Sequence, residues 1–248
     1  MSQSEQNQSA DAAAADSGWK NLYKVGGAAA VLILLTSLTE ILITFLPGGY
    51  ASAESVNEWF TLFQRNSFLA LRNLGLLNIV MTTFEIPMLF AIYAAHRMVA
   101  RPFAALALIL TFIGIAVFYA TNRAFAMLDL SSQYASASTG EQRTIIAAAG
   151  QAMLAAGRSH TPGTFLGFFF METGAILMSV VMLTGKIFSK PAAYFGIAGC
   201  GLLLLFDACA SFLLSLSNAA LIIAMLGGVS TMVWYILIAR RLFQLARE

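Results

Sequence analysis

Six long apolar stretches constrain this sequence more than any other feature, because each has the length of a membrane span. A helix needs about 20 apolar residues to cross the roughly 30 Å of bilayer hydrocarbon. Open sheet edges cannot be satisfied in lipid, and the stretches lack two-residue alternation, so helices are the economical interpretation. The sequence therefore predicts an all-α polytopic membrane helix bundle with six transmembrane helices. We expect the spans at about residues 25–46, 68–93, 104–120, 165–183, 192–214 and 219–239.

The composition agrees with a membrane environment. Hydrophobic residues make up 59% of the chain, charged residues 10%, and the mean hydropathy is +0.77. Soluble proteins contain about one quarter charged residues, so this chain has too few charges to cover a water-exposed surface. The net charge of +2 gives no basis for nucleic-acid binding. The lipid bilayer is the first expected partner.

The N-terminal region has two interpretations. Residues 1–18 are rich in Ser, Gln, Ala and Asp without apolar periodicity, which predicts a disordered cytoplasmic tail before a six-helix domain of residues 19–248. Alternatively, Lys20 and Lys24 precede an apolar segment, and the Ala-Ser-Ala at 51–53 resembles a signal-peptidase site. The apolar core is about 22 residues long, however, where signal peptides use about 7–15, and Glu40 interrupts it. We therefore expect this segment to remain as the first span.

Lysine and arginine placement predicts the orientation, since cytoplasmic loops are enriched in both. With the N-terminus inside, nine fall on the inner side and five on the outer side. The inner residues are Lys20, Lys24, Arg97, Arg101, Lys186, Lys190, Arg240, Arg241 and Arg247. The outer residues are Arg65, Arg72, Arg123, Arg143 and Arg158. We expect a multi-pass protein of the plasma (inner) membrane with both termini cytoplasmic.

The two longer outer loops carry helix signals. Ser55 and Glu58 have the spacing of a capping box, ahead of apolar residues on one helical face, and Ser138 and Glu141 repeat that spacing in the loop of residues 121–162. We expect a short amphipathic helix in each loop. Both helices could form a structural cap, or they could act as a gate or a partner surface.

Ionisable residues inside the spans are the candidate functional residues. A charge at the bilayer centre costs about 2.5–3.5 kcal/mol on insertion scales, so such residues usually face the bundle interior and are paired. At a rise of 1.5 Å per residue, four of them lie about 7–13 Å below the outer span ends. The predicted outer cluster is Glu40, Arg72, Glu172 and Asp207, with Arg123 at the outer end of the third span.

Two interpretations of this cluster stay open. In the first, Arg72 neutralises Glu40 or Asp207 in a structural ion-pair network that fixes helix register. In the second, the cluster lines a polar cavity open to the outside, which binds a small ligand or carries protons.

A second intramembrane acid lies deeper. Glu85 belongs to the inner half of the second span and shares a helical face with Asn78, seven residues earlier. The simplest interpretation is a protonated acid that bonds to a neighbouring helix.

Other chemistry finds no support in the sequence. Cys200 and Cys209 point to opposite sides of one helix, so they predict no disulfide. His96 and His160 are the two histidines, one at a cytoplasmic flank and one in an outer loop without an obvious partner. No nucleophile elbow, zinc helix or phosphate-binding loop is present in the sequence. We expect no metal, no cofactor and no catalytic residue.

Three passages show a resemblance. They are EWFTLFQ at 58–64, NRAFAMLDLSSQYA at 122–135 and FSKPAAYFGI at 188–197. Between Trp19 and about Ala239 the chain resembles prokaryotic six-span membrane proteins that are grouped only as a domain of unknown function. The resemblance implies the same six-helix architecture and brings no catalytic residues.

The functional expectation follows from these features. The leading hypothesis is a non-enzymatic membrane protein that binds or senses a small or amphiphilic molecule in an outward-facing polar pocket. The runner-up is a small proton-coupled transporter that uses Glu40, Asp207 and Glu172. A membrane-embedded enzyme is disfavoured because no nucleophile–base pair is recognisable.

Overall fold

The structure is a computed structural model that describes residues 3–46, 53, 55–213 and 216–248. Within these ranges it is built from ten helices and contains no strand. The helices are α1 (Gln3–Phe45), α2 (Val56–Arg65), α3 (Ser67–Asn73), α4 (Leu76–His96), α5 (Arg101–Thr121), α6 (Ala124–Ser136), α7 (Gly140–Gly157), α8 (Phe165–Gly185), α9 (Lys190–Phe212) and α10 (Ser217–Leu245).

Six of the described helices are long and apolar enough to cross a membrane, namely α1, α4, α5, α8, α9 and α10. The predicted all-α, six-span fold is therefore confirmed. These helices carry many large apolar side chains on the outside of the bundle, including Leu42, Phe103, Leu166 and Val229, each more than half exposed. Such a surface is stable in lipid and not in water.

The spans pack as neighbours in space, with α5 against α8, α8 against α9, α9 against α10, and α1 against both α4 and α10. Small residues allow some of these close approaches. A Cβ atom added at Gly114 of α5 would lie 2.5 Å from the backbone nitrogen of Met171, and one at Gly174 of α8 would lie 2.7 Å from that of Thr111. The α5–α8 interface thus depends on glycine from both sides, as is common between membrane helices.

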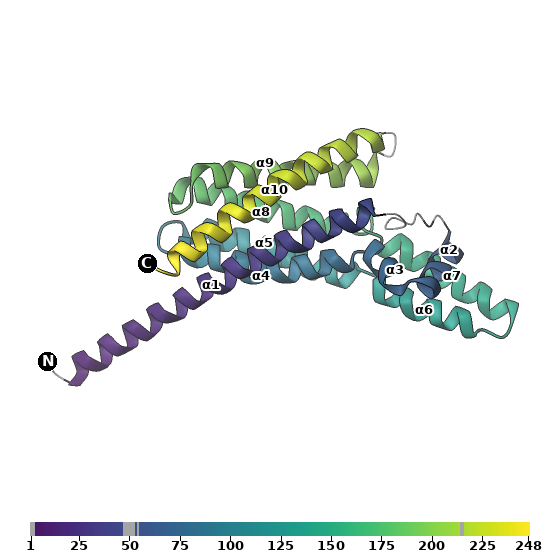
Figure 1. The fold of residues 1–248 in the computed structure, drawn as a ribbon, viewed down its shortest axis with the longest axis horizontal. Coiled ribbons are helices and arrows are strands. Elements are labelled where there is room, and N and C mark those ends of the chain that lie inside the picture. The colour runs from purple at the N-terminus through teal and green to yellow at the C-terminus, as the bar shows by residue number, and fades with distance from the viewer. Residues whose placement is uncertain (1–2, 47–52, 54, 214–215) are drawn as a thin grey trace.

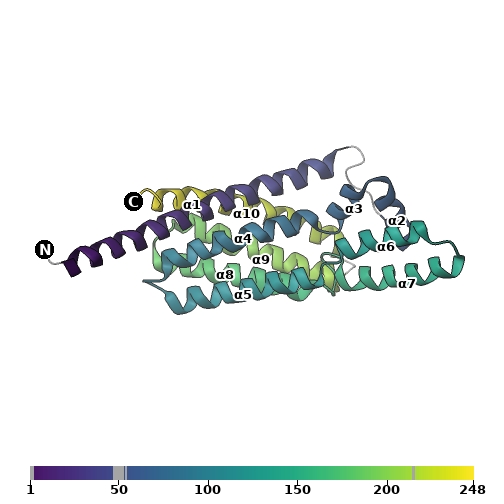
Figure 2. The same cartoon turned by 90° about the horizontal axis from the view of Figure 1, so that it is seen from below.

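Four further helices form a cap beyond one end of the bundle, and both chain termini lie at the opposite end (Figures 1 and 2). We call α2, α3, α6 and α7 the cap, and we refer to the two ends of the bundle as the cap end and the terminal end. The cap has its own apolar core, in which Trp59, Phe60 and Phe63 of α2 pack with Met127 of α6.

The two predicted loop helices are present, with one shift. Ser55 caps α2 by accepting a hydrogen bond from the Glu58 backbone nitrogen, as the capping box predicts. In α7 the cap is Thr139 rather than Ser138, and its hydroxyl accepts from the backbone nitrogen of Gln142. The Thr139–Gln142 pair has the same spacing one residue later, so it competes successfully for the cap position. Helix α6 was not among the predicted elements.

Two other boundaries differ from the sequence prediction. The predicted second span, 68–93, is divided into α3 and α4, because Gly75 has a φ of +96° and turns the chain between them. Helix α1 extends back to Gln3, through residues that the sequence predicts to be a disordered tail. The alanine-rich composition of this segment favours helix, and a helix already formed in the first span needs no new nucleus to extend. Residues 51 and 52 of the possible cleavage motif lie outside the described residues.

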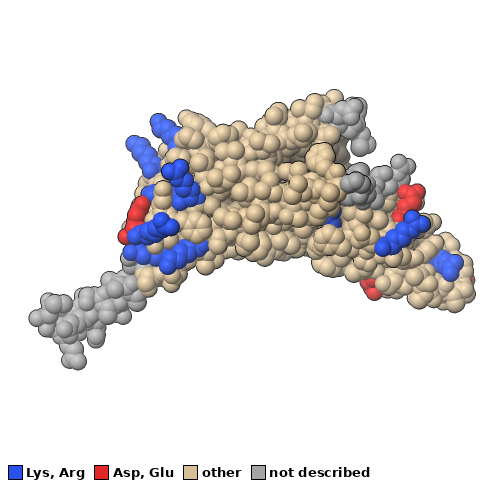
Figure 3. All heavy atoms as spheres, in the orientation of Figure 1, with Lys and Arg blue, Asp and Glu red and all other residues tan. Residues whose placement is uncertain are grey.

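Charged side chains gather at the two ends of the molecule, and the face between them is almost free of charge (Figure 3). Basic residues dominate the terminal end. This distribution is what a membrane-spanning bundle requires, since charge is tolerated outside the hydrocarbon and excluded from its lipid-facing surface.

Candidate functional site

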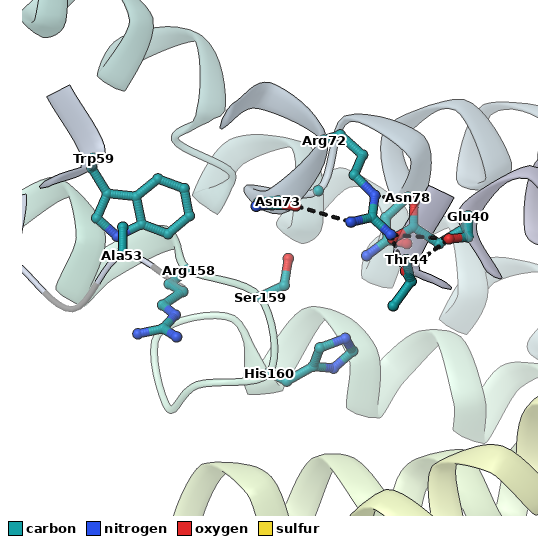
Figure 4. Close-up of a pocket in the computed structure, with 11 residues that line it drawn as sticks. Glu40, Thr44, Ala53, Trp59, Arg72, Asn73, Asn78, Arg158, Ser159 and His160 are labelled. Carbon is teal, nitrogen blue, oxygen red and sulfur yellow. Dashed lines mark hydrogen bonds and ion pairs between the residues drawn. The ribbon is translucent and has the colours of Figure 1, made fainter. Parts of the chain in front are cut away.

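An open cavity of about 210 Å³ lies between the cap end of the spans and the cap. Its wall combines side chains of α1, α2, α3 and α4 with the loop that joins α7 to α8 (Figure 4). The lining residues are Glu40, Thr44, Ala53, Trp59, Arg72, Asn73, Gly75, Asn78, Arg158, Ser159 and His160.

An ion pair between Arg72 and Glu40 forms one wall of the cavity. The distance from Arg72 Nη2 to Glu40 Oε1 is 2.7 Å, and Nε donates to Oε2 at 3.1 Å. Arg72 also donates to the Glu40 carbonyl at 2.9 Å, to Asn73 Oδ1 at 3.0 Å and to the Thr44 hydroxyl. Its side chain is 2% exposed, whereas that of Glu40 is 34% exposed. The pairing of Arg72 with Glu40, one of the two partners predicted for it, is therefore present, and the acid faces the cavity.

The α3–α4 turn holds Arg72 in place. The Asn122 side chain donates to the Leu74 carbonyl at 2.9 Å, which ties the turn to the end of α5. A Cβ at Gly75 would lie 2.9 Å from the Ser159 hydroxyl, so the turn also fits closely against the α7–α8 loop. A positive φ at this point strongly favours glycine.

Asp207 pairs with His160, not with Arg72. The distance from His160 Nδ1 to Asp207 Oδ1 is 2.5 Å, and the Asp207 side chain is 3% exposed. The imidazole stacks on Phe168 and lies against Phe206, each with ring centroids 4.8 Å apart. His160, which has no obvious partner in the sequence, thus has Asp207 as its partner in the structure. With Arg72 paired to Glu40, the buried acid Asp207 still needs a hydrogen-bond donor. That requirement is the observation from which His160 could have been predicted as its partner.

Glu172 does not line the cavity, contrary to its predicted place in the outer cluster. It hydrogen-bonds with the buried thiol of Cys200 and interacts electrostatically with Asp207 and Glu85. Glu85 in turn accepts a hydrogen bond from the Tyr235 hydroxyl at 3.2 Å, which is the predicted bond to a neighbouring helix. These residues form an interior polar group that extends from Asp207 into the bundle.

Asn78 and Arg123 also differ from expectation. Asn78 lines the cavity rather than joining Glu85 in a second site. Arg123 precedes α6 and packs against Gly157, and its buried Nε has no hydrogen-bond partner among the described residues. It is therefore part of the cap structure and not of the cavity lining.

The cavity presents unused polar groups. Arg158 is exposed and makes no side-chain hydrogen bond or ion pair within the described part of the chain. The Ser159 hydroxyl is buried and likewise has no partner there. Because Glu40 is neutralised by Arg72, and Asp207 is bonded to His160, Arg158 leaves the lining with an excess of positive charge. The described residues contain no group of three His, Cys, Asp or Glu side chains that could hold a metal ion.

Comparisons of the chain with protein-family models, curated proteins and solved structures find no match. The resemblance noted from the sequence thus stays a prediction.

Proposed function

We propose that this protein binds a small amphiphilic molecule in the cavity at the cap end, without catalysing a reaction on it. The observation that carries this proposal is the open polar cavity itself, with the ion pair of Arg72 and Glu40 in its wall. An ion-pair network that only fixed helix register would need no open space beside it. A site with few polar groups at precise positions in a concave wall is typical of small-molecule binding.

The orientation belongs to the same proposal. Nine Lys and Arg residues belong to the terminal end and five to the cap end, so the positive-inside rule favours cytoplasmic termini and an outward-facing cavity. The protein would then be a multi-pass protein of the inner (plasma) membrane whose site faces outward.

The chemistry of the lining favours a ligand with an anionic head and an apolar chain. Arg158 offers a guanidinium group, which binds carboxylate or phosphate with paired hydrogen bonds, and Ser159 adds a free hydroxyl. Next to the cavity, the last turns of α1 expose Leu42 at 67% and Phe45 at 80%. An apolar chain could lie along this surface while the head occupies the cavity.

Trp59 provides a direct test, because its ring lines the cavity and the chain has three tryptophans in all. In a variant with Trp19→Phe and Trp234→Phe, Trp59 is the sole tryptophan, and its emission can be excited selectively over that of the tyrosines. Dodecanoate brominated next to its carboxylate should quench it saturably, and brominated dodecylammonium should do so only weakly. Arg158→Gln should weaken the carboxylate's affinity about tenfold, the worth of one hydrogen bond to a charged group.

The matched control is Arg65→Gln, which removes the same charge from the cap but lies outside the cavity lining. It should change the affinity less than about twofold, since exposed charges act weakly at a distance. Absence of saturable quenching by either amphiphile would remove the binding proposal.

A second candidate function is proton-coupled transport, favoured by the interior polar group. His160 lines the cavity and bonds to Asp207, and Asp207 interacts with Glu172, so titratable groups continue from the cavity into the bundle. Ionisable residues at membrane depth often mark proton pathways. The proposed carriers are Glu40, Asp207 and Glu172.

Liposomes that contain a pH-sensitive dye test this candidate. Under an imposed pH gradient, with candidate ligand present, wild-type protein should acidify the lumen faster than Glu172→Gln. Glu141→Gln, in an exposed first turn of α7, is the control and should match the wild type. Equal flux in wild type and Glu172→Gln would remove the transport candidate and leave the binding proposal intact.

A further inference from the structure

A second cavity, of about 250 Å³, lies at the terminal end of the bundle. It forms where α9 begins and the last turns of α10 pass it. Its lining consists of Ser189, Leu237, Arg240, Arg241 and Gln244. This composition combines two guanidinium groups and two neutral polar groups with one apolar side chain.

The two arginines have different roles in this wall. Arg241 is fixed, since its Nε donates to the Ile187 carbonyl at 2.8 Å and its Nη1 lies 2.7 Å from Glu248 Oε1. Arg240 is exposed and makes no hydrogen bond or ion pair with any residue that the structure describes. Glu248 is the only acid within salt-bridge distance of either arginine in the described ranges, so positive charge prevails in the cavity.

The position of the cavity distinguishes a lipid from a soluble anion. It lies at the ends of two candidate spans, where α9 begins and α10 nears its last turn, and Leu237 forms part of its wall. Apolar side chains are exposed on the same two helices, since Tyr194 of α9 is 59% exposed and Ile236 of α10, the neighbour of Leu237 in sequence, is 50% exposed. A ligand here would place an anionic group against the arginines and apolar chains against the neighbouring helix surfaces.

We propose that this cavity binds the phosphate group of an anionic phospholipid. Guanidinium groups suit phosphate because they donate two parallel hydrogen bonds, and basic pockets between membrane helices at the cytoplasmic surface are suited to anionic headgroups. The site is separate from the cavity at the cap end, and the proposal rests on the proposed orientation but not on the ligand proposed there.

Native mass spectrometry of the full chain tests the proposal. Protein is released from nanodiscs of equal phosphatidylglycerol and phosphatidylcholine, and bound lipids are counted. The wild type should retain phosphatidylglycerol preferentially, and Arg240→Gln should reduce that retention about tenfold, as expected for one charge-assisted contact. Glu248→Gln should increase it, because the acid that competes for Arg241 is removed.

Arg101→Gln is the matched control, since Arg101 is an exposed arginine at the same end of the bundle that lies outside the cavity lining. It should leave retention within about twofold of the wild type, because surface charges at a distance are screened. An equal loss of phosphatidylglycerol retention in Arg101→Gln and Arg240→Gln would refute a specific site and indicate attraction by general surface charge. Displacement of the lipid by millimolar glycerol phosphate would refute the assignment of a lipid ligand and indicate a soluble phosphate compound instead. No preference for phosphatidylglycerol in the wild type would overturn the proposal outright.

Discussion

Replacing Glu40 with glutamine removes the acid from the ion pair in the cavity wall and leaves Arg72 buried. Breaking a fully buried pair from one side costs about 3–5 kcal/mol, because one charge is left without its partner. Two features reduce this figure here. The Glu40 side chain is 34% exposed, so solvent screens part of the interaction, and Arg72 keeps its bonds to the Glu40 carbonyl and Asn73. We therefore expect Glu40→Gln to lower the free energy of unfolding by about 1–2 kcal/mol.

A double-mutant cycle separates the pair from its surroundings. Arg72→Met should lower the free energy of unfolding by less than the number of hydrogen bonds it removes would suggest. The reason is that Glu40 faces the cavity and can be hydrated there. In the Glu40→Gln background, Arg72→Met removes the unpaired charge as well. We expect a coupling energy of about 1 kcal/mol or more between the two positions, as is usual for residues in direct contact.

The measurement is reversible unfolding in mixed micelles, followed by circular dichroism as the fraction of denaturing detergent rises. The control is the pair of Arg241 and Glu248, which has the same 2.7 Å distance but side chains that are 28% and 61% exposed. Glu248→Gln should cost less than about 0.5 kcal/mol, as for other exposed pairs. If Glu40→Gln costs no more than Glu248→Gln, or if the cycle is additive within about 0.5 kcal/mol, burial does not strengthen this pair and the reasoning is refuted.

Three further predictions use the same unfolding assay. Gly75→Ala should destabilise the protein by about 1–2 kcal/mol, because the φ of +96° at this position disfavours any Cβ. The control Gly201→Ala should not destabilise it, because a Cβ there meets no atom within 4 Å, and equal effects of the two substitutions would contradict the prediction. Tyr235→Phe should cost about 0.5–1.5 kcal/mol through the lost bond to Glu85, and Tyr194→Phe at an exposed position should cost nothing measurable. His160→Leu should cost about 1.5–3 kcal/mol by removing the hydrogen-bond partner of Asp207, and a stability equal to wild type would show that the 2.5 Å contact contributes nothing.

The six spans could be predicted from the sequence because their cause is local. Hydrocarbon thickness sets a minimum length for each apolar run, and no tertiary contact is needed to apply that rule. The division at Gly75 is different. Residues 68–93 are apolar enough to read as one span, and the turn is fixed by contacts with Asn122 and Ser159, which are distant in sequence.

The residues of the site could be predicted in type, but their partners only in part. The rule that a buried charge needs a partner identified Glu40, Arg72, Asp207 and Glu85 as residues of interest. It could not tell that Asp207 bonds to His160, because a loop residue has no helical phase from which to calculate its direction. The same limit applies to Glu172, whose hydrogen-bond partner is Cys200, a residue that nothing in its apolar sequence surroundings marks as polar.

The cap has a further consequence for the charges beneath it. Basic residues at the terminal end can remain in water, whereas Arg72 and Asp207 lie within or beside the spans and must be neutralised by the protein. Arg72 finds its partner on α1, but Asp207 finds its partner on the α7–α8 loop, which the cap helices hold against the bundle. Movement of that loop would therefore change the cavity wall and leave Asp207 without its hydrogen bond at the same time. His160 thus belongs both to the lining of the cavity and to the pair that neutralises Asp207.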